Sequence, residues 1–149
     1  MRFVPILILL VVAMTFTVPV ASVYGSSPVV HLRITTYSNT ALTMRTVKVQ
    51  AGGSLYVVVS LVNGAGSPVE WTSSVPLGIT LAAKGGELSS TNVFITAGNY
   101  NTSASFGLIL YIAPSAVGVQ HIRASAIINN VAQATLKGLL VVPAPEYSV

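Results

Sequence analysis

The chain has 149 residues, of which 52% are hydrophobic and only 7% charged, with a formal net charge of +4 and no Cys. Soluble domains usually carry about 25% charged residues, so this composition excludes a disordered polar tail, and seven dispersed cations are too few for a nucleic-acid-binding surface. The lack of Cys excludes disulfide scaffolds and thiolate metal sites, and the lack of Asp removes the usual orienting residue of hydrolytic triads.

Residues 1–25 have the pattern of a secretory signal peptide. A basic residue, Arg2, precedes the apolar run 3–12, and small residues follow. We expect cleavage after Ser22 or after Gly25, and therefore an extracellular protein without a membrane segment. An uncleaved anchor is the alternative, because the apolar stretch approaches the roughly 20 residues that span a bilayer.

After residue 25 the dominant sequence period is two, which predicts β-strands with one apolar face. The expected apolar faces are Val30, Leu32 and Ile34; Leu55, Val57, Val59 and Leu61; Phe106, Leu108, Leu110 and Ile112; and Ile122, Ala124, Ala126 and Ile128. The expected strands are 29–36, 45–49, 54–62, 69–72, 77–83, 91–96, 102–112, 119–128 and 131–142. No segment has sustained helical periodicity with caps.

Turn residues separate these strands. Gly and Asn tolerate positive φ and Pro presets φ, so clusters of these residues between apolar runs predict turns. The pair Asn129-Asn130 predicts a two-residue hairpin loop. Short strands with a turn every 8–12 residues or so predict an all-β protein, a β-sandwich of about seven to nine antiparallel strands.

Several expected strands, notably 54–62, 106–112 and 138–142, are apolar on both faces. In an antiparallel sandwich one face normally meets water, so these strands need cover from a neighbouring subunit, a glycan layer or a membrane. The alternative is that Val and Ile occur on both faces only because they have a high propensity for β-strands.

Three segments between residues 47 and 142 resemble the bacterial Ig-like domains of invasin- and intimin-type adhesins. These segments are GSLYVVVSLVNGAGSPV at 53–69, GGELS at 85–89 and GVQHIRASA at 118–126. The resemblance implies an Ig-like β-sandwich over residues 45–142. Val62 stands where the relatives usually carry an acidic residue before Asn-Gly, so a calcium-linked role is not carried over.

Residues 26–44 precede the Ig-like segment and contain the alternating strand with Val30, Leu32 and Ile34. A spare N-terminal strand before such a domain resembles subunits of archaeal threads and bundling pili and the chaperone–usher pilins. In these filaments the strand of one subunit fills a groove in the next, which is donor-strand complementation. The alternative is that residues 29–36 form the first strand of their own sandwich. Residues 143–149 form a short tail in which Pro ends the last strand.

The inventory of reactive side chains predicts neither an enzyme nor a metal or cofactor site. His31 and His121 are the only histidines, and a zinc site that used both would need two of the three Glu residues. Glu70 and Glu87 fall near expected turns and Glu146 lies in the tail, so no acid is predicted beside a Ser and a base.

Two other residues are candidates for surface functions. Asn101 begins the only Asn-X-Ser/Thr sequon, which in an exported chain marks a surface loop that can carry an N-glycan. Trp71 is interpreted as a core anchor, with sugar stacking as the alternative.

The expected function is therefore that of a structural subunit of an extracellular cell-surface filament, a head-to-tail homopolymer built by donor-strand complementation. A monomeric cell-surface adhesion or glycan-binding module is the alternative.

Overall fold

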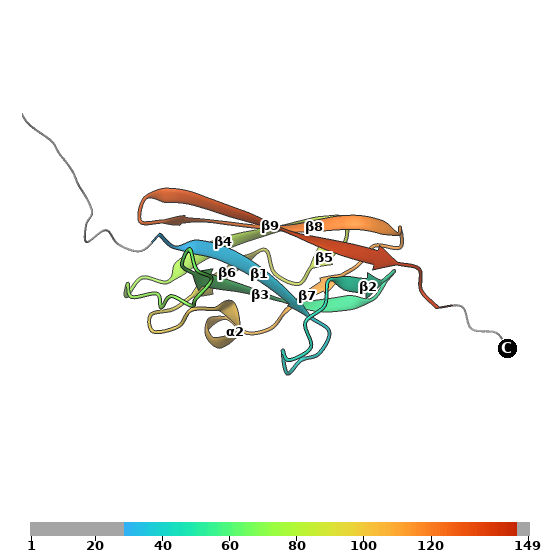
Figure 1. Ribbon diagram of the computed structural model, residues 1–149, viewed down its shortest axis with the longest axis horizontal. Helices are drawn as coiled ribbons and strands as arrows, with labels where there is room; N and C mark the ends of the chain where they lie inside the picture. Colours follow the sequence, from blue (N-terminus) through green and yellow to red (C-terminus); the bar gives the residue numbers. More distant parts are fainter. Residues whose placement is uncertain (1–28, 146–149) are drawn as a thin grey trace, which may run out of the picture.

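The computed structural model describes residues 29–145, which form two packed β-sheets (Figure 1). The strand order is β1-β3-β7-β5 in the four-stranded sheet and β2-β9-β8-β4-β6 in the five-stranded sheet. The elements are β1 (His31–Tyr37), β2 (Lys48–Gln50), β3 (Ser54–Val62), β4 (Leu77–Lys84), β5 (Glu87–Leu88), β6 (Asn92–Ile95), α2 (Thr102–Ser105), β7 (Ile109–Ile112), β8 (Gly118–Ile128) and β9 (Val131–Val142). The all-β prediction is confirmed, whereas the signal peptide falls outside the described residues.

All strand pairs are antiparallel except one. β2 pairs with β9 in parallel, with Lys48 opposite Leu140 and Gln50 opposite Val142. The chain passes from β1 in one sheet to β2 in the other, and then back to β3. β1 and β9, from different sheets, therefore lie side by side along one flank of the molecule (Figure 1).

The core forms where alternate residues of both sheets meet. The apolar faces predicted for β3 and β8 do point inward, and in β1 Leu32 and Ile34 do the same. The most deeply buried side chains are Tyr111, Leu55, Leu61, Ile79, Leu81, Ile95, Ile109, Ile122, Leu139, Val57, Val59 and Val141.

The β8–β9 hairpin forms where the sequence predicted it. Asn129 and Asn130 have φ of 52° and 65°, so the two central residues are both left-handed, as in the turns that match the twist of paired strands. From Ile128 opposite Val131, the register continues without a bulge to Gly118 opposite Val141.

The prediction of one strand over 102–112 is wrong. Residues 102–105 are helical because the Asn101 side chain accepts a hydrogen bond from the Ala104 N–H and caps the first turn. Gly107, with φ of 120°, then separates this turn from β7. This break changes the alternation, so Ile109 and Tyr111 face the core while Leu108 is exposed.

Two further strand predictions differ from the structure. Residues 69–72 are not a strand, although the N–H of Val69 donates to the Leu61 carbonyl at 2.9 Å. The two-residue strand β5, which pairs with β7, has no periodic signal in the sequence and was not predicted.

The two-sided apolar strand β3 receives its outer cover from the same chain. Val58 and Val62 point away from the core cluster, yet they are only 5% and 6% exposed. The turn after β3 folds back so that Pro68 bridges to Val62, and Asn101 bridges to Ser60. This half of β3 therefore needs no neighbouring subunit.

Candidate assembly interface

β1 is the edge strand of the four-stranded sheet and contains the residues predicted to act as a donor strand. It pairs with β3 of its own chain, from His31 opposite Val62 to Tyr37 opposite Tyr56. Leu32 and Ile34 are buried, and Val30 packs against the core from just before the strand. The structure thus has the arrangement that the sequence left as the alternative, a first strand of its own sandwich. Exchange of β1 between copies stays a prediction.

The loop after β1 is tied down by hydrogen bonds from a few residues. The Asn39 Oδ1 accepts from the N–H groups of Thr43 and Met44 at 3.1 and 3.0 Å. Leu42 adopts a left-handed φ of 57° at the tip, which is uncommon for a residue other than Gly, Asn or Asp. The loop returns along β1, where the Thr46 N–H donates to the Thr36 carbonyl at 3.1 Å.

The edge of β9 opposite β8 is largely unpaired among the described residues. Because Ile128 and Val131 flank a two-residue hairpin loop, odd-numbered residues of β9 bond to β8 and even-numbered ones direct N–H and C=O away from it. The N–H of Leu140 indeed donates to the Val47 carbonyl at 2.8 Å, and the carbonyl of Val142 accepts from Ala51. β2 pairs only with residues 140–142, so the edge over residues 132–138 has no partner strand within 29–145.

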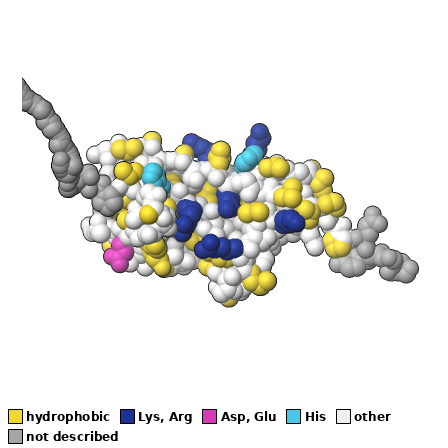
Figure 2. All heavy atoms as spheres, in the orientation of Figure 1, with side chains coloured by type: hydrophobic (Ala, Val, Ile, Leu, Met, Phe, Trp, Pro, Cys, Tyr) yellow, Lys and Arg dark blue, Asp and Glu magenta, His cyan; other side chains and the backbone are white. Residues whose placement is uncertain are grey.

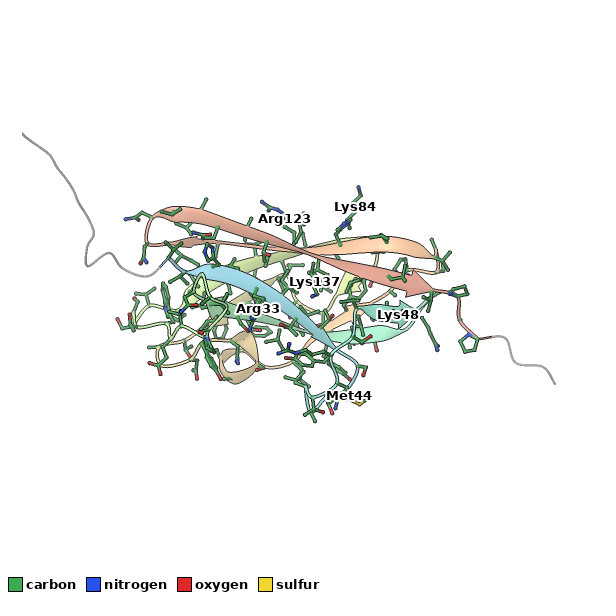
Figure 3. All side chains as sticks on the ribbon, in the orientation of Figure 1. Arg33, Met44, Lys48, Lys84, Arg123 and Lys137 are labelled. Carbon is green, nitrogen blue, oxygen red and sulfur yellow. The ribbon has the colours of Figure 1, made fainter. Side chains whose placement is uncertain are left out.

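A groove of about 370 Å³ lies between β1 and β9. Three cationic residues line it, Arg33 from β1, Arg45 from the following loop and Lys137 from β9. Figure 3 labels Arg33 and Lys137 on this flank, and Figure 2 shows Lys and Arg gathered near the middle of the same view. Glu70 and Glu87 are the only acids within 29–145, and neither lines the groove.

The outer face of the five-stranded sheet is open to solvent and largely apolar. Val119, Ile127 and Leu136 are 63%, 69% and 63% exposed. Arg123 and Lys84 also point outward from this sheet (Figure 3), and with His121 and Leu136 they line a hollow of about 380 Å³. Large apolar side chains are less exposed on the four-stranded sheet, where Ile112 of β7 is 43% exposed.

Trp71 lies at the margin of the core and not at its centre. Its indole N–H donates to the Val75 carbonyl at 2.7 Å, which folds the 71–76 segment over the end of β4. A groove of about 690 Å³ extends from Trp71 across Thr80, Ser125 and Gln133. The side chain is half-buried, so it combines a packing role with one accessible edge.

The sequon residues have clear structural roles. The Asn101 Oδ1 caps α2 and also accepts from the Ser103 hydroxyl at 2.9 Å. Thr102 is fully buried, and its Oγ1 accepts from the Val59 N–H at 3.0 Å. Asn101 is itself only partly exposed. Its occupancy by a glycan stays a prediction.

The His and Glu side chains of residues 29–145 do not converge. His31 and His121 lie on different sheets, and no group of three or more His, Asp or Glu side chains is placed to hold a metal ion. Tyr111 is the buried ionisable group: its hydroxyl donates to the Gly85 carbonyl at 2.9 Å, and burial raises the pKa of this phenol.

The sequence reasoning missed the cationic groove and the open edge of β9. Arg33, Arg45 and Lys137 are far apart in sequence and carry no motif. A mismatch in strand length was the available signal, because a strand expected over 131–142 has twelve residues while a partner expected over 45–49 could cover only part of it.

Comparison of the chain with protein-family models, curated proteins and solved structures finds no match. Among residues 29–145, no helix is both long and apolar enough to cross a membrane.

Proposed function

We propose that this chain is an exported, Ig-like structural subunit of a cell-surface filament, in which β1 of one copy pairs with β3 of the next. The sheet order supports the Ig-like relation. If β1, β3, β7 and β5 are strands A, B, E and D, then β9, β8 and β4 are G, F and C, as in constant-type Ig domains. β6 extends the second sheet beyond strand C, although it follows β5 along the chain.

The observation that carries the proposal is the position of β1. It is the first described strand, it lies at a sheet edge, and β3 is its only partner strand. When such a strand leaves, it breaks no pair with another named strand, and beyond β3 it loses only the backbone contacts with the returning loop at Arg45 and Thr46. A second copy can then make the same pairs and bury the same Leu32 and Ile34, which makes exchange of an identical element inexpensive.

The charge-poor composition and the exposed apolar sheet face support assembly as well. On the outer face of the five-stranded sheet, Val119 and Leu140 lie opposite each other and are 63% and 39% exposed, and covering such side chains in an assembly removes apolar surface from water. The first described residues and the last lie at opposite ends of the molecule (Figure 1), which suits head-to-tail contacts. Such contacts form filaments when they do not close into a ring.

A cross-strand disulfide tests the exchange directly. The chain has no Cys, so Thr35→Cys with Val58→Cys introduces one defined pair at opposed positions of β1 and β3. In exchanged filaments oxidation links successive copies, and we expect a ladder of multimers in denaturing, non-reducing electrophoresis. Ser125→Cys with Ala134→Cys is the matched control, because these residues face each other within one hairpin and the bond stays inside one chain.

The proposal is wrong if the assembled, oxidised protein runs entirely as monomer, because β1 then stays in its own chain. The Thr35→Cys single variant, which can form at most a disulfide-linked dimer, reports how much nonspecific oxidation occurs between chains.

The second candidate is a monomeric cell-surface module that binds glycans. The groove beside Trp71 favours it, because an aromatic edge and the polar groups of Thr80, Arg123 and Ser125 suit a sugar ring. A species that stays monomeric at high concentration and loses glycan binding on Trp71→Ala would favour this function over the filament.

A further inference from the structure

The edge of β9 over residues 132–138 carries backbone groups that have no partner strand within residues 29–145. The N–H and C=O groups of Ala132, Ala134, Leu136 and Gly138 point away from β8, and no strand of residues 29–145 pairs with them. A row of unpaired backbone donors and acceptors is complementary to an extended peptide. β2 already occupies the same edge further along, in parallel with residues 140–142.

The charge of the adjoining groove specifies what such a peptide must carry. Lys137 is on the inward face of β9, and Arg33 and Arg45 line the same groove. Arg33 donates to the Gly66 carbonyl at 3.2 Å, so its guanidinium is held at the turn after β3, and Lys137 and Arg45 are the cations left to bind a ligand in the groove. A peptide that lies here is favoured if it places a carboxylate on its inward face.

The chain itself contains a segment with both properties. Residues 143–149 read PAPEYSV and include Glu146, the only acid of the sequence outside residues 29–145. Pro143 and Pro145 lack N–H groups at alternate positions. In an extended conformation the N–H groups of residues 144, 146 and 148 lie along one edge, whereas the other edge lacks donors at 143 and 145, so the even-numbered edge is the better one for pairing.

The direction of pairing follows from the side-chain faces. In an antiparallel ladder residue 146 would lie opposite an even-numbered residue of β9, which places its side chain on the outer apolar face. In a parallel ladder residue 146 would instead lie opposite an odd-numbered residue of β9, so its side chain would share the inward face with Gln133, Thr135 and Lys137. The parallel pair of β2 and β9 is an example, because Val49 lies opposite Val141 and both side chains face inward. Only the parallel arrangement brings Glu146 to the cationic groove.

We propose that residues 143–149 of one copy add as a parallel strand to the free edge of β9 in the next copy, with the Glu146 carboxylate bound by Lys137 and Arg45. β9 ends at the opposite end of the molecule from the start of β1 (Figure 1), so two copies in the same orientation place this segment at the start of the next β9. Seven extended residues span about 23 Å, enough to cover most of the open edge. The inference rests on the proposed self-assembly and adds a second junction to it.

A peptide titration tests this junction. The probe is the synthetic heptapeptide PAPEYSV, added to the ¹⁵N-labelled mature full chain at a concentration that keeps the chain monomeric. We expect amide shifts at Ala132, Ala134, Leu136 and Gly138. The Glu146→Gln peptide should bind about tenfold more weakly, because it loses charge-assisted hydrogen bonds. Added salt should weaken the Glu peptide more than the Gln peptide.

Two variants of the chain make the test specific. Ala134→Pro removes a donor from the open edge without touching the β8 ladder, and should abolish binding, whereas Ala134→Ser keeps the N–H and should bind normally. In the full-length chain, Lys137→Glu and Glu146→Lys should each weaken self-association, and the double variant should restore it. If Ala134→Pro fails to fold, the test relies on Lys137→Glu, which should weaken binding of the PAPEYSV peptide.

The inference is wrong if the peptide causes no shifts, if the shifts map away from β9, or if the Gln peptide binds as tightly as the Glu peptide. Failure of β1 exchange gives a different result, because the peptide complex is read as a 1:1 binding event and needs no filament. If the chain binds the peptide but forms no disulfide ladder, the junction at β9 is supported and the exchange of β1 is excluded.

Discussion

The two sheets of this sandwich have similar interiors and very different exteriors. On the four-stranded sheet, the outward-facing Val58 and Val62 are 5% and 6% exposed because residues 63–69 and the segment before α2 fold along β3. On the five-stranded sheet, Leu136 and Ile127 are 63% and 69% exposed. Apolar residues on both faces of a strand therefore do not by themselves indicate a partner subunit. Only apolar side chains that the chain itself leaves exposed have that need.

The same contrast applies to the strand edges. The open half of β3 is completed by residue 100, whose carbonyl accepts from the Leu61 N–H at 2.8 Å, and by Thr102. The open part of β9 has no such completion within the described chain. The chain thus covers this half of β3 locally and leaves the edge of β9 over residues 132–138 available.

The largest expected effects test the shared interior. Leu55→Ala and Leu81→Ala remove side chains that are each 1% exposed, one from each sheet. We expect each to lower the free energy of unfolding by about 3 kcal/mol, measured by urea denaturation of the dilute chain. A cost below about 1 kcal/mol for either would show that its sheet is not packed on the common core.

The next effect tests the local cover of β3. Thr102→Val is nearly isosteric but leaves the buried Val59 N–H without its acceptor, which should cost about 2 kcal/mol. Ser103→Ala is the control, because Ser103 bonds only to Asn101 Oδ1 at the helix start and should cost about 0.5 kcal/mol. Equal losses in the two variants would contradict the role given to Thr102.

A smaller effect compares the two outer faces directly. Val58→Ala should destabilise the chain by about 1.5 kcal/mol because its methyl groups are buried. Leu136→Ala deletes more apolar atoms but should change the monomer by no more than about 0.5 kcal/mol, since the side chain is already solvated. If the outer face is covered in the assembled state, Leu136→Ala lowers self-association instead, which sedimentation velocity would detect.

The smallest effect concerns alkaline pH. Burial raises the pKa of Tyr111 above its ordinary value of 10.0. The unfolded chain therefore releases this proton first, and stability should decline as pH rises above about 10. Tyr111→Phe should reduce this decline and lose the hydrogen bond to the Gly85 carbonyl. An unchanged pH profile of thermal unfolding in Tyr111→Phe would contradict this account.

Alternation along the chain was enough to predict most of the fold. The bounds of β3 and β9 and the inward faces of β3 and β8 follow from period-two patterns, and the β8–β9 hairpin follows from Asn129-Asn130. The pattern failed at residues 102–112 because a side-chain cap at Asn101 and a positive φ at Gly107 interrupt the strand. Capping and turn geometry act over a few residues, and apolar periodicity does not report them.

The assembly surfaces were only partly predictable. Val30, Leu32 and Ile34 were identified as a strand with one apolar face, which is a local property. Whether that face pairs with β3 of the same copy depends on how the 38–47 loop returns the chain, and that loop relies on Asn39 and a left-handed Leu42. The groove of Arg33, Arg45 and Lys137 depends on bringing β1 beside β9.

The sequence by itself determined that this protein is all-β, poor in charge and apolar on both faces of several strands, because these are properties of composition and of nearest-neighbour alternation. The tertiary structure alone decided which apolar faces and which backbone edges stay uncovered. That outcome depends on contacts between residues distant in the chain, such as Pro68 on Val62 and β2 on the last residues of β9. Whether an apolar face or a backbone edge is covered depends on the packing of the whole chain, and no local sequence pattern encodes it.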